Sequence, residues 1–179
     1  MCDRACIDFG KNLTREMVEG RRVLEVGSLD INGSLREYIT SLKPAGYVGC
    51  DIVPGKGVDT ICAAEGLIHI YRVETFDIVI STEMLEHVKD WRSAIYNMKH
   101  VCAKGGHILI TTRSRGFSKH NHPHDFWRFE EEDMRAIFAD FEIIKTEKDI
   151  YAPGIFILAR KPETHSPISL EEIEPYEVK

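Results

Sequence analysis

The sequence lacks features that would place it in several large classes of protein. No stretch of about 18 apolar residues occurs, so no membrane-spanning helix and no membrane partner are expected. The opening residues, MCDRACIDFG, carry charges where a secretory signal peptide has its apolar core. We therefore expect a cytoplasmic protein. Its length of 179 residues fits one domain with a single sizeable core.

The sequence also lacks paired cysteine spacing and an excess of positive charge. The five cysteines form no CxxC pair, which argues against a disulfide framework or a zinc site and favours reduced, structural thiols: Cys2, Cys6, Cys50, Cys62 and Cys102. The net charge of −6 disfavours nucleic acid as a partner, because phosphate binding requires a basic surface. The sequence leaves the oligomeric state open.

Short apolar runs alternate with amphipathic stretches through most of the chain. Strands are expected at residues 21–27, 46–52, 58–61, 76–81 and 105–112. A helix is expected at residues 34–43, where Ser34 and Glu37 have capping-box spacing, and a second from residue 83 to about 102, broken near Asp90. This alternation predicts an α/β domain with a mostly parallel sheet.

The end of the chain follows another pattern. Two strand-like runs, at residues 140–150 and 154–161, predict a C-terminal antiparallel hairpin. We expect residues 1–20 to form an N-terminal appendage helix, residues 21–161 the main domain, and residues 162–179 an acidic tail. Three prolines in the tail disfavour regular structure.

The segment VLEVGSLDING, residues 23–33, predicts a ligand-binding loop at the end of the first strand. Gly27 and Gly33 allow close approach of the backbone to a ligand, although a simple turn between strand and helix would also use glycine. The loop lacks the GxGxxG spacing of a dinucleotide site, which disfavours a nicotinamide cofactor. Asp51 ends the second strand, near the offset of an acid that binds a ribose diol.

Four motifs occur in order: VLEVGSLDINGSLREYI, YVGCDIVPGKGVD, FDIVISTEMLEHVKDW and GGHILITT. Together they resemble the class I S-adenosylmethionine-dependent methyltransferases, of the small type 11 kind, over roughly residues 20–161. The resemblance implies a Rossmann-like, doubly wound, mostly parallel sheet that closes with an antiparallel hairpin. It also implies S-adenosylmethionine as cofactor and methyl transfer to a small-molecule acceptor.

The resemblance also assigns residues to parts of the cofactor. Glu25, Gly27 and Ser28 would lie against its amino-acid end, in a loop longer than the family's usual ExGxGxG. Asp51 would hold the ribose diol, and Ile52 would pack on the adenine.

Four further residues complete the implied cofactor site. Ala64 and Glu65 would line the adenine edge, where Ala63 stands in place of a common aspartate. Glu83 and Met84, after the fourth strand, would border the methionine moiety.

A general base is not obligatory, because aligning the reactants can supply roughly 7–11 kcal/mol of barrier lowering. In EMLEHV, residues 83–88, His87 is a candidate base, and its i,i+4 spacing from Glu83 predicts that the two share a helix face. The acids there equally suit the first turn of a helix.

The segment SKHNHPHDFWRF, residues 118–129, follows the fifth strand and resembles a stretch found in many type 11 enzymes. His124 is a second candidate base, and four residues are candidates for binding the acceptor: Arg113, His122, Trp127 and Arg128. The local positive charge suggests an anionic acceptor.

Two other interpretations of this segment stay open. Its histidines and Asp125 have the ligand types for a divalent metal ion, and the aromatic residues would also suit a structural plug. A substrate-contacting loop is preferred, so no metal site is assigned. Alternative functions are a non-catalytic S-adenosylmethionine-binding partner protein and an NAD-linked oxidoreductase.

Overall fold

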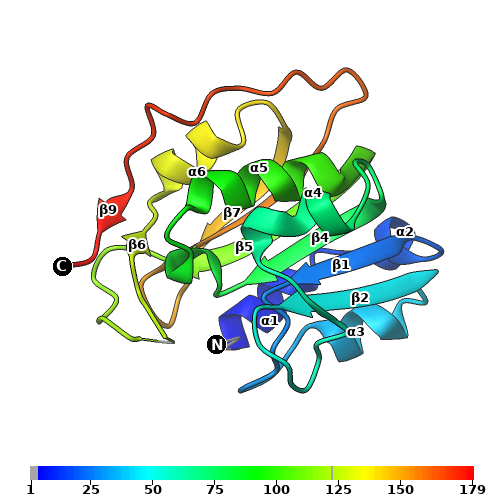
Figure 1. Cartoon of the computed structure of the whole chain (residues 1–179), viewed down its shortest axis with the longest axis horizontal. Coiled ribbons are helices and arrows are strands. Elements are labelled where there is room, and N and C mark those ends of the chain that lie inside the picture. The colour runs from blue at the N-terminus through cyan, green and yellow to red at the C-terminus, as the bar shows by residue number, and fades with distance from the viewer. Residues whose placement is uncertain (1–3, 122) are drawn as a thin grey trace.

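The computed structural model describes residues 4–121 and 123–179 and is built around a seven-stranded sheet (Figure 1). The strand order is β3-β2-β1-β4-β5-β8-β7. The strands are β1 (Arg22–Val26), β2 (Gly46–Asp51), β3 (Thr60–Ile61), β4 (Phe76–Thr82), β5 (Cys102–Arg113), β7 (Glu142–Lys148) and β8 (Gly154–Arg160). Strands β1 to β5 are parallel to one another, and β8 is antiparallel to both β5 and β7. The predicted parallel sheet with a closing hairpin is confirmed.

Helices cover both faces of this sheet (Figure 1). One face carries α4 (Leu67–Ile70), α5 (Trp91–Val101) and α6 (Glu131–Ile137), with the 3-10 helices η1 (Ala64–Gly66) and η2 (Leu85–His87). The other face carries α1 (Arg4–Gly10), α2 (Arg15–Val18) and α3 (Arg36–Ser41). In the described part of the chain, no helix has both the length and the apolar character needed to cross a bilayer.

The central strands contribute to two separate apolar cores. Leu24 and Val79 pack in the core beneath α5, whereas Val23, Ile78 and Ile80 pack in the core beneath α1 and α3. Successive strand residues point to opposite faces of a sheet. Because both faces are covered, the strands have continuous apolar sequences rather than alternating ones.

The first twenty residues, which we expected to be an appendage, contribute to the second core from residue 4 onward. Cys6 and Leu13 are fully buried, and Phe9 is 2% exposed. Burial of a side chain such as Phe9 contributes roughly 1.5–3 kcal/mol to folding. Segment 4–20 therefore shares the core of the main domain. Cys2 lies outside the described residues.

The acidic tail is also attached to the domain. The guanidinium of Arg92 on α5 donates hydrogen bonds to the backbone oxygens of Leu170 and Ile173, at 3.0 and 2.6 Å. Further on, β9 (Tyr176–Glu177) pairs antiparallel with β6 (Trp127–Arg128). These contacts fix the tail along α5 and beside the segment that precedes α6.

The predicted capping box at residues 34–37 is wrong. Helix α3 begins at Arg36 with Leu35 as its N-cap, so Ser34 lies one position too early to act as the cap. Its Oγ instead accepts a hydrogen bond from the Arg36 N–H at 3.0 Å. A capping box does occur at α6, between Glu130 and Asp133.

Candidate functional site

A cavity of about 730 Å³ lies at the carboxyl ends of β1, β2 and β4. This end of a parallel sheet is where open α/β folds bind ligands. All nine residues that the sequence assigned to a cofactor line it: Glu25, Gly27, Ser28, Asp51, Ile52, Ala64, Glu65, Glu83 and Met84. Residues distant in the sequence therefore meet in one place.

Glu25 lies at the inner end of the cavity and is only 2% exposed. Its Oε2 accepts a hydrogen bond from the Tyr47 hydroxyl at 2.8 Å, and its Oε1 accepts one from Ser34 Oγ at 3.4 Å. Burial raises the pKa of Glu25 from 4.5 to about 7, against the opposing effect of the Tyr47 hydrogen bond. A nearby cation would favour the ionised form.

The loop after β1 is fastened to β2. The N–H groups of Gly27 and Ser28 both donate to the Cys50 carbonyl oxygen, at 2.9 and 3.0 Å. Gly27 has a φ of +79°, and a Cβ there would lie 2.5 Å from Cγ of Met84. Only glycine fits this turn without displacing Met84.

Ser28 has an unsatisfied polar group at the cavity wall. The residue is 1% exposed, and its Oγ has no hydrogen-bond partner among the described residues. A buried hydroxyl without a partner is destabilising by about 1–3 kcal/mol. A polar ligand in the cavity would relieve that cost.

The carboxylate of Asp51 is held at the mouth of the cavity by two backbone groups. Its Oδ2 accepts from the Leu29 N–H at 3.1 Å, and its Oδ1 accepts from the Val53 N–H at 3.2 Å. Each oxygen keeps further acceptor capacity for a ligand. Beside it, Ile52 is 58% and Val53 43% exposed, so an apolar wall is open to a ligand.

Glu83 directly follows β4 and has a strained conformation, with a φ of +53°. Its buried carboxylate pairs with Arg113, whose Nη1 also lies 3.0 Å from Asp149 Oδ2. Burial, and then the charge of Glu86, raise the pKa of Glu83, and Arg113 opposes them. Strain of this kind is concentrated at functional sites.

The guanidinium groups expected to bind an acceptor form ion pairs within the protein. Arg113 is 4% exposed, and Arg128 is 2% exposed. Arg128 contacts the Asp125 carboxylate at 2.5 and 2.7 Å. Although burial raises the pKa of Asp125, the hydrogen bonds from Arg128 hold it at about 2. Because both guanidinium groups are buried and paired, they do not provide the predicted anion site.

The indole N–H of Trp127 is also hydrogen-bonded within the protein. Its Nε1 donates to the backbone oxygens of Val88 and Lys89, at 3.0 and 3.2 Å. Among the described residues, the cavity lining does not include Arg113, Trp127 or Arg128. The fourth candidate, His122, lies outside the described residues.

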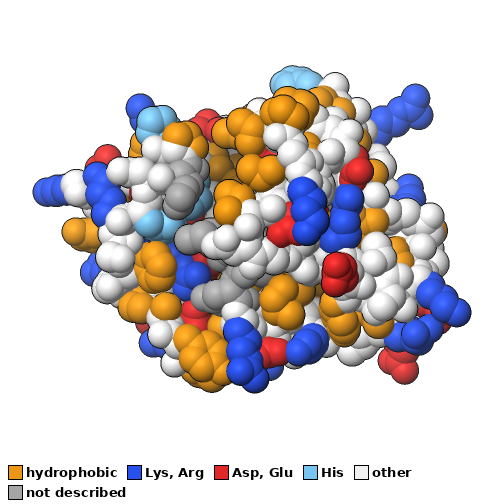
Figure 2. Space-filling model, turned by 90° about the horizontal axis from the view of Figure 1, so that it is seen from below, with side chains coloured by type: hydrophobic (Ala, Val, Ile, Leu, Met, Phe, Trp, Pro, Cys, Tyr) orange, Lys and Arg blue, Asp and Glu red, His pale blue; other side chains and the backbone are white. Residues whose placement is uncertain are grey.

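Both candidate bases line the cavity. His87 Nδ1 lies 2.5 Å from the backbone oxygen of His124, which links η2 to the segment before β6. Histidine side chains are visible at the left of Figure 2, and His87 and His124 both line the cavity. This end of the cavity is therefore rich in imidazole, whereas the end near β2 is apolar and acidic.

Several lining residues had no distinct signal in the sequence: Leu29, Ile31, Val53, Lys89, Pro123 and Phe126. Leu29, Ile31 and Val53 belong to loops whose path depends on long-range hydrogen bonds, such as that from the Leu29 N–H to Asp51. Loop conformations of this kind cannot be inferred from residue periodicity.

The fold and the site define a class of protein. Residues 3–137 match a family model described as a methyltransferase domain. The chain belongs to this methyltransferase-domain family, whose fold is that of the class I S-adenosylmethionine-dependent enzymes. The resemblance identified from the four motifs is confirmed.

Solved structures share the fold at low sequence identity. An S-adenosylmethionine-dependent methyltransferase from Mesorhizobium loti has a TM-score of 0.69 and 13% identity, covering 88% of this chain and 98% of its own. A 1,6-didemethyltoxoflavin-N1-methyltransferase from Burkholderia thailandensis, solved with S-adenosylhomocysteine, has a TM-score of 0.67 and 13% identity, covering 89% and 79%.

A curated relative is nearer in sequence. The ubiquinone biosynthesis O-methyltransferase of Rhizobium etli is 31% identical over 127 residues, which cover 63% of this chain and 50% of that protein. The chain therefore spans about half the length of the curated relatives it matches.

Proposed function

We propose that this protein transfers the methyl group of S-adenosylmethionine to a small-molecule acceptor. The observation that carries the proposal is that all nine expected cofactor residues line one cavity. Membership of the methyltransferase-domain family supports the same activity.

The polar and apolar groups of the cavity fit this cofactor. The unpartnered Oγ of Ser28 and the carboxylate of Glu25 suit a charged amino-acid end. Asp51, oriented by two N–H groups, suits a ribose diol. Ile52 supplies an apolar surface for a flat base.

When bound, S-adenosylmethionine supplies a methyl group on a positively charged sulfur. The chain contributes by orienting the cofactor and the acceptor and by excluding water from the cavity. Glu25 would hold the amino-acid end of the cofactor and Asp51 its ribose, while Ile52 and Val53 would cover one side of its base. Alignment of this kind accounts for much of the barrier lowering that this chemistry requires.

The acceptor belongs at the end of the cavity formed by His87, Pro123, His124 and Phe126. We propose that its nucleophile is an oxygen, because the curated relatives are O-methyltransferases and the histidines offer a base for a hydroxyl. The suggestion that the acceptor is anionic loses its support, since Arg113 and Arg128 are buried in ion pairs.

Calorimetry with S-adenosylhomocysteine and with NAD tests the cofactor. We expect binding of S-adenosylhomocysteine alone, and binding of NAD alone would favour the oxidoreductase. Transfer of labelled methyl groups to a set of hydroxylated small molecules then tests the activity. Tight cofactor binding without transfer to any acceptor would favour a non-catalytic binding protein.

A further inference from the structure

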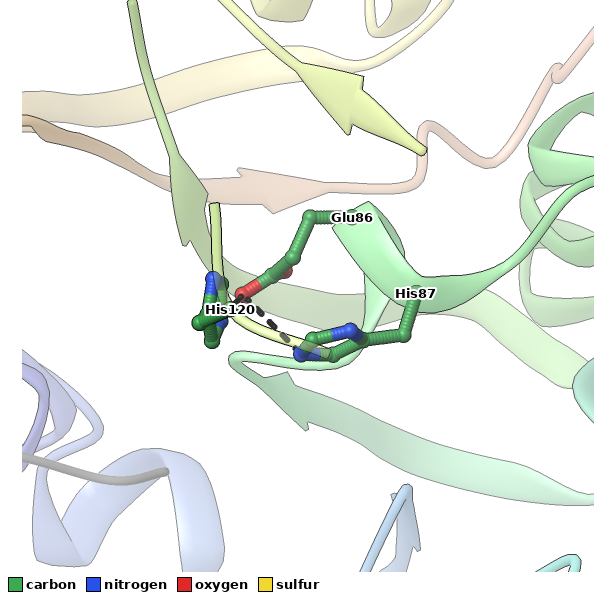
Figure 3. Close-up of side chains that lie close together, drawn as sticks. All are labelled: Glu86, His87 and His120. Carbon is green, nitrogen blue, oxygen red and sulfur yellow. Dashed lines mark ion pairs between the residues drawn. The ribbon is translucent and has the colours of Figure 1, made fainter. Parts of the chain in front are cut away.

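Three metal-ligating side chains converge beside the cofactor cavity: Glu86 and His87 from η2, and His120 from the segment between β5 and β6 (Figure 3). Their ligand atoms all lie within 4.8 Å of one another. Glu86 Oε1 lies 3.8 Å from His87 Nε2 and 3.9 Å from His120 Nε2. In Figure 3 both rings approach the Glu86 carboxylate from different elements.

The Glu86 carboxylate is completely buried. Its Oε2 accepts a hydrogen bond from Thr112 Oγ1 at 2.9 Å. Its Oε1, the atom that faces the two imidazoles, has no hydrogen-bond partner within the described part of the chain. A buried carboxylate oxygen is unfavourable unless hydrogen bonds or a cation compensate it.

An oxygen atom lies close to Nδ1 of each imidazole ring. His87 Nδ1 lies 2.5 Å from the His124 backbone oxygen, and His120 Nδ1 lies 3.1 Å from Asp125 Oδ2. The His124 backbone oxygen is an acceptor, so a neutral His87 ring carries its proton on Nδ1 and directs the lone pair of Nε2 toward Glu86. The negative charge of Asp125 beside Nδ1 favours the same arrangement in His120. A carbonyl or carboxylate behind the ring is the usual environment of metal-bound histidine.

We propose that Glu86, His87 and His120 bind a divalent transition-metal ion of the Zn²⁺ type. Two imidazoles and one carboxylate form a zinc ligand set, whereas Mg²⁺ favours oxygen ligands. Tetrahedral ligands at about 2.1 Å from the ion lie about 3.4 Å apart, so the side chains need only small inward movements. Three protein ligands leave one position open, as in catalytic zinc sites.

The position of the site suggests its use, which rests on the proposed methyl transfer. Because His87 also lines the cavity, an ion here lies at the acceptor end. It would take a hydroxylated acceptor at its open position and lower the pKa of that hydroxyl. His87 then acts as a ligand and no longer as a base. The proton leaves to solvent, and the acceptor oxygen forms the new O–C bond. The C–S bond breaks with its electron pair on sulfur, which yields S-adenosylhomocysteine.

Competition between the protein and a chromogenic chelator for Zn²⁺ tests the site directly. We expect one equivalent to bind, and His120→Asn and Glu86→Gln to weaken binding at least tenfold. His69→Asn is the matched control, because His69 is exposed on α4, and it should bind as the wild type does. Less than one equivalent, or wild-type affinity in His120→Asn, would overturn the site.

Thermal melts without metal check that the variants fold. Glu86 is buried, so Glu86→Gln is the variant at greater risk of unfolding; the His120 side chain is 17% exposed, which makes His120→Asn the deciding variant. Wild-type melting of His120→Asn together with weaker Zn²⁺ binding would support the site.

A second measurement separates this inference from the proposed function. S-adenosylhomocysteine affinity should be the same with and without chelator, whereas methyl transfer should fall at least tenfold in chelator and recover with Zn²⁺. Zn²⁺ binding without cofactor binding would support the metal site and overturn the methyltransferase proposal. Full transfer in chelator would overturn the role of the metal in catalysis.

Discussion

The hydroxyl of Tyr47 on β2 donates a 2.8 Å hydrogen bond to the carboxylate of Glu25 on β1. The parallel register places Val23 opposite Tyr47, so the tyrosine reaches forward along the neighbouring strand to the acid at the cavity. Glu25 is thereby held in a buried position with its pKa raised to about 7. The acid that the cavity presents is therefore costly to ionise without a ligand.

Glu25→Gln should flatten the dependence of stability on pH. The folded-state pKa of about 7 lies above the ordinary 4.5, so the folded state binds more protons than the unfolded state between these values. The resulting stability is present at low pH and is lost as the pH rises through about 7. Between about pH 5 and pH 8 the wild type should lose roughly 2–3 kcal/mol more than the variant. Urea unfolding at both pH values measures this, and equal losses would contradict it.

Asp51→Asn should weaken S-adenosylhomocysteine binding. The amide offers one acceptor in place of a carboxylate, and hydrogen bonds to charged groups contribute about 1.5–3 kcal/mol each. We expect roughly a 10- to 100-fold rise in Kd by calorimetry. Asp77→Asn is the control, because Asp77 accepts from the Arg22 N–H at the opposite end of the sheet. An equal effect of both substitutions would remove Asp51 from the site.

Arg113→Met should destabilise the fold by about 3–5 kcal/mol, because it leaves the buried carboxylates of Glu83 and Asp149 without their cation. The free energy of unfolding in urea is the measurement. Arg115→Met, at an exposed position on the same segment, should cost less than about 1 kcal/mol. A mild effect at Arg113 would contradict the stabilising role of these buried ion pairs.

Gly27→Ala should impair both folding and cofactor binding. The added Cβ meets Met84 at 2.5 Å, and the φ of +79° is unfavourable for alanine. We expect a loss of about 1–3 kcal/mol in unfolding free energy and weaker S-adenosylhomocysteine binding. In Gly46→Ala the Cβ would have nothing within 4 Å, so that variant should behave as the wild type. Normal cofactor binding by Gly27→Ala would show that the Met84 side chain can move to make room for the added Cβ.

Much of the fold follows from local sequence. The strand predicted at residues 76–81 is β4, because an apolar run ending beside polar residues suits a strand buried on both faces. The capping box predicted at Ser34 is wrong, because α3 begins at Arg36 with Leu35 as its N-cap. Residue periodicity does not locate the end of a helix to within one residue. The core position of Phe9 also escaped prediction, because an amphipathic segment does not indicate which surface will cover it.

The sequence by itself determined the succession of strands and helices along the chain, the glycine loop after β1 and the acid at the end of β2, because each depends on neighbouring residues and their spacing. Only the tertiary structure decided how the charged side chains are used. Arg113 and Arg128 have the chemistry of anion-binding residues, yet buried carboxylates neutralise both. Glu86 meets His120 only because η2 packs beside the segment that follows β5. Partners brought together by folding set the charge, burial and reach of a side chain, and the spacing of residues along the chain does not contain that information.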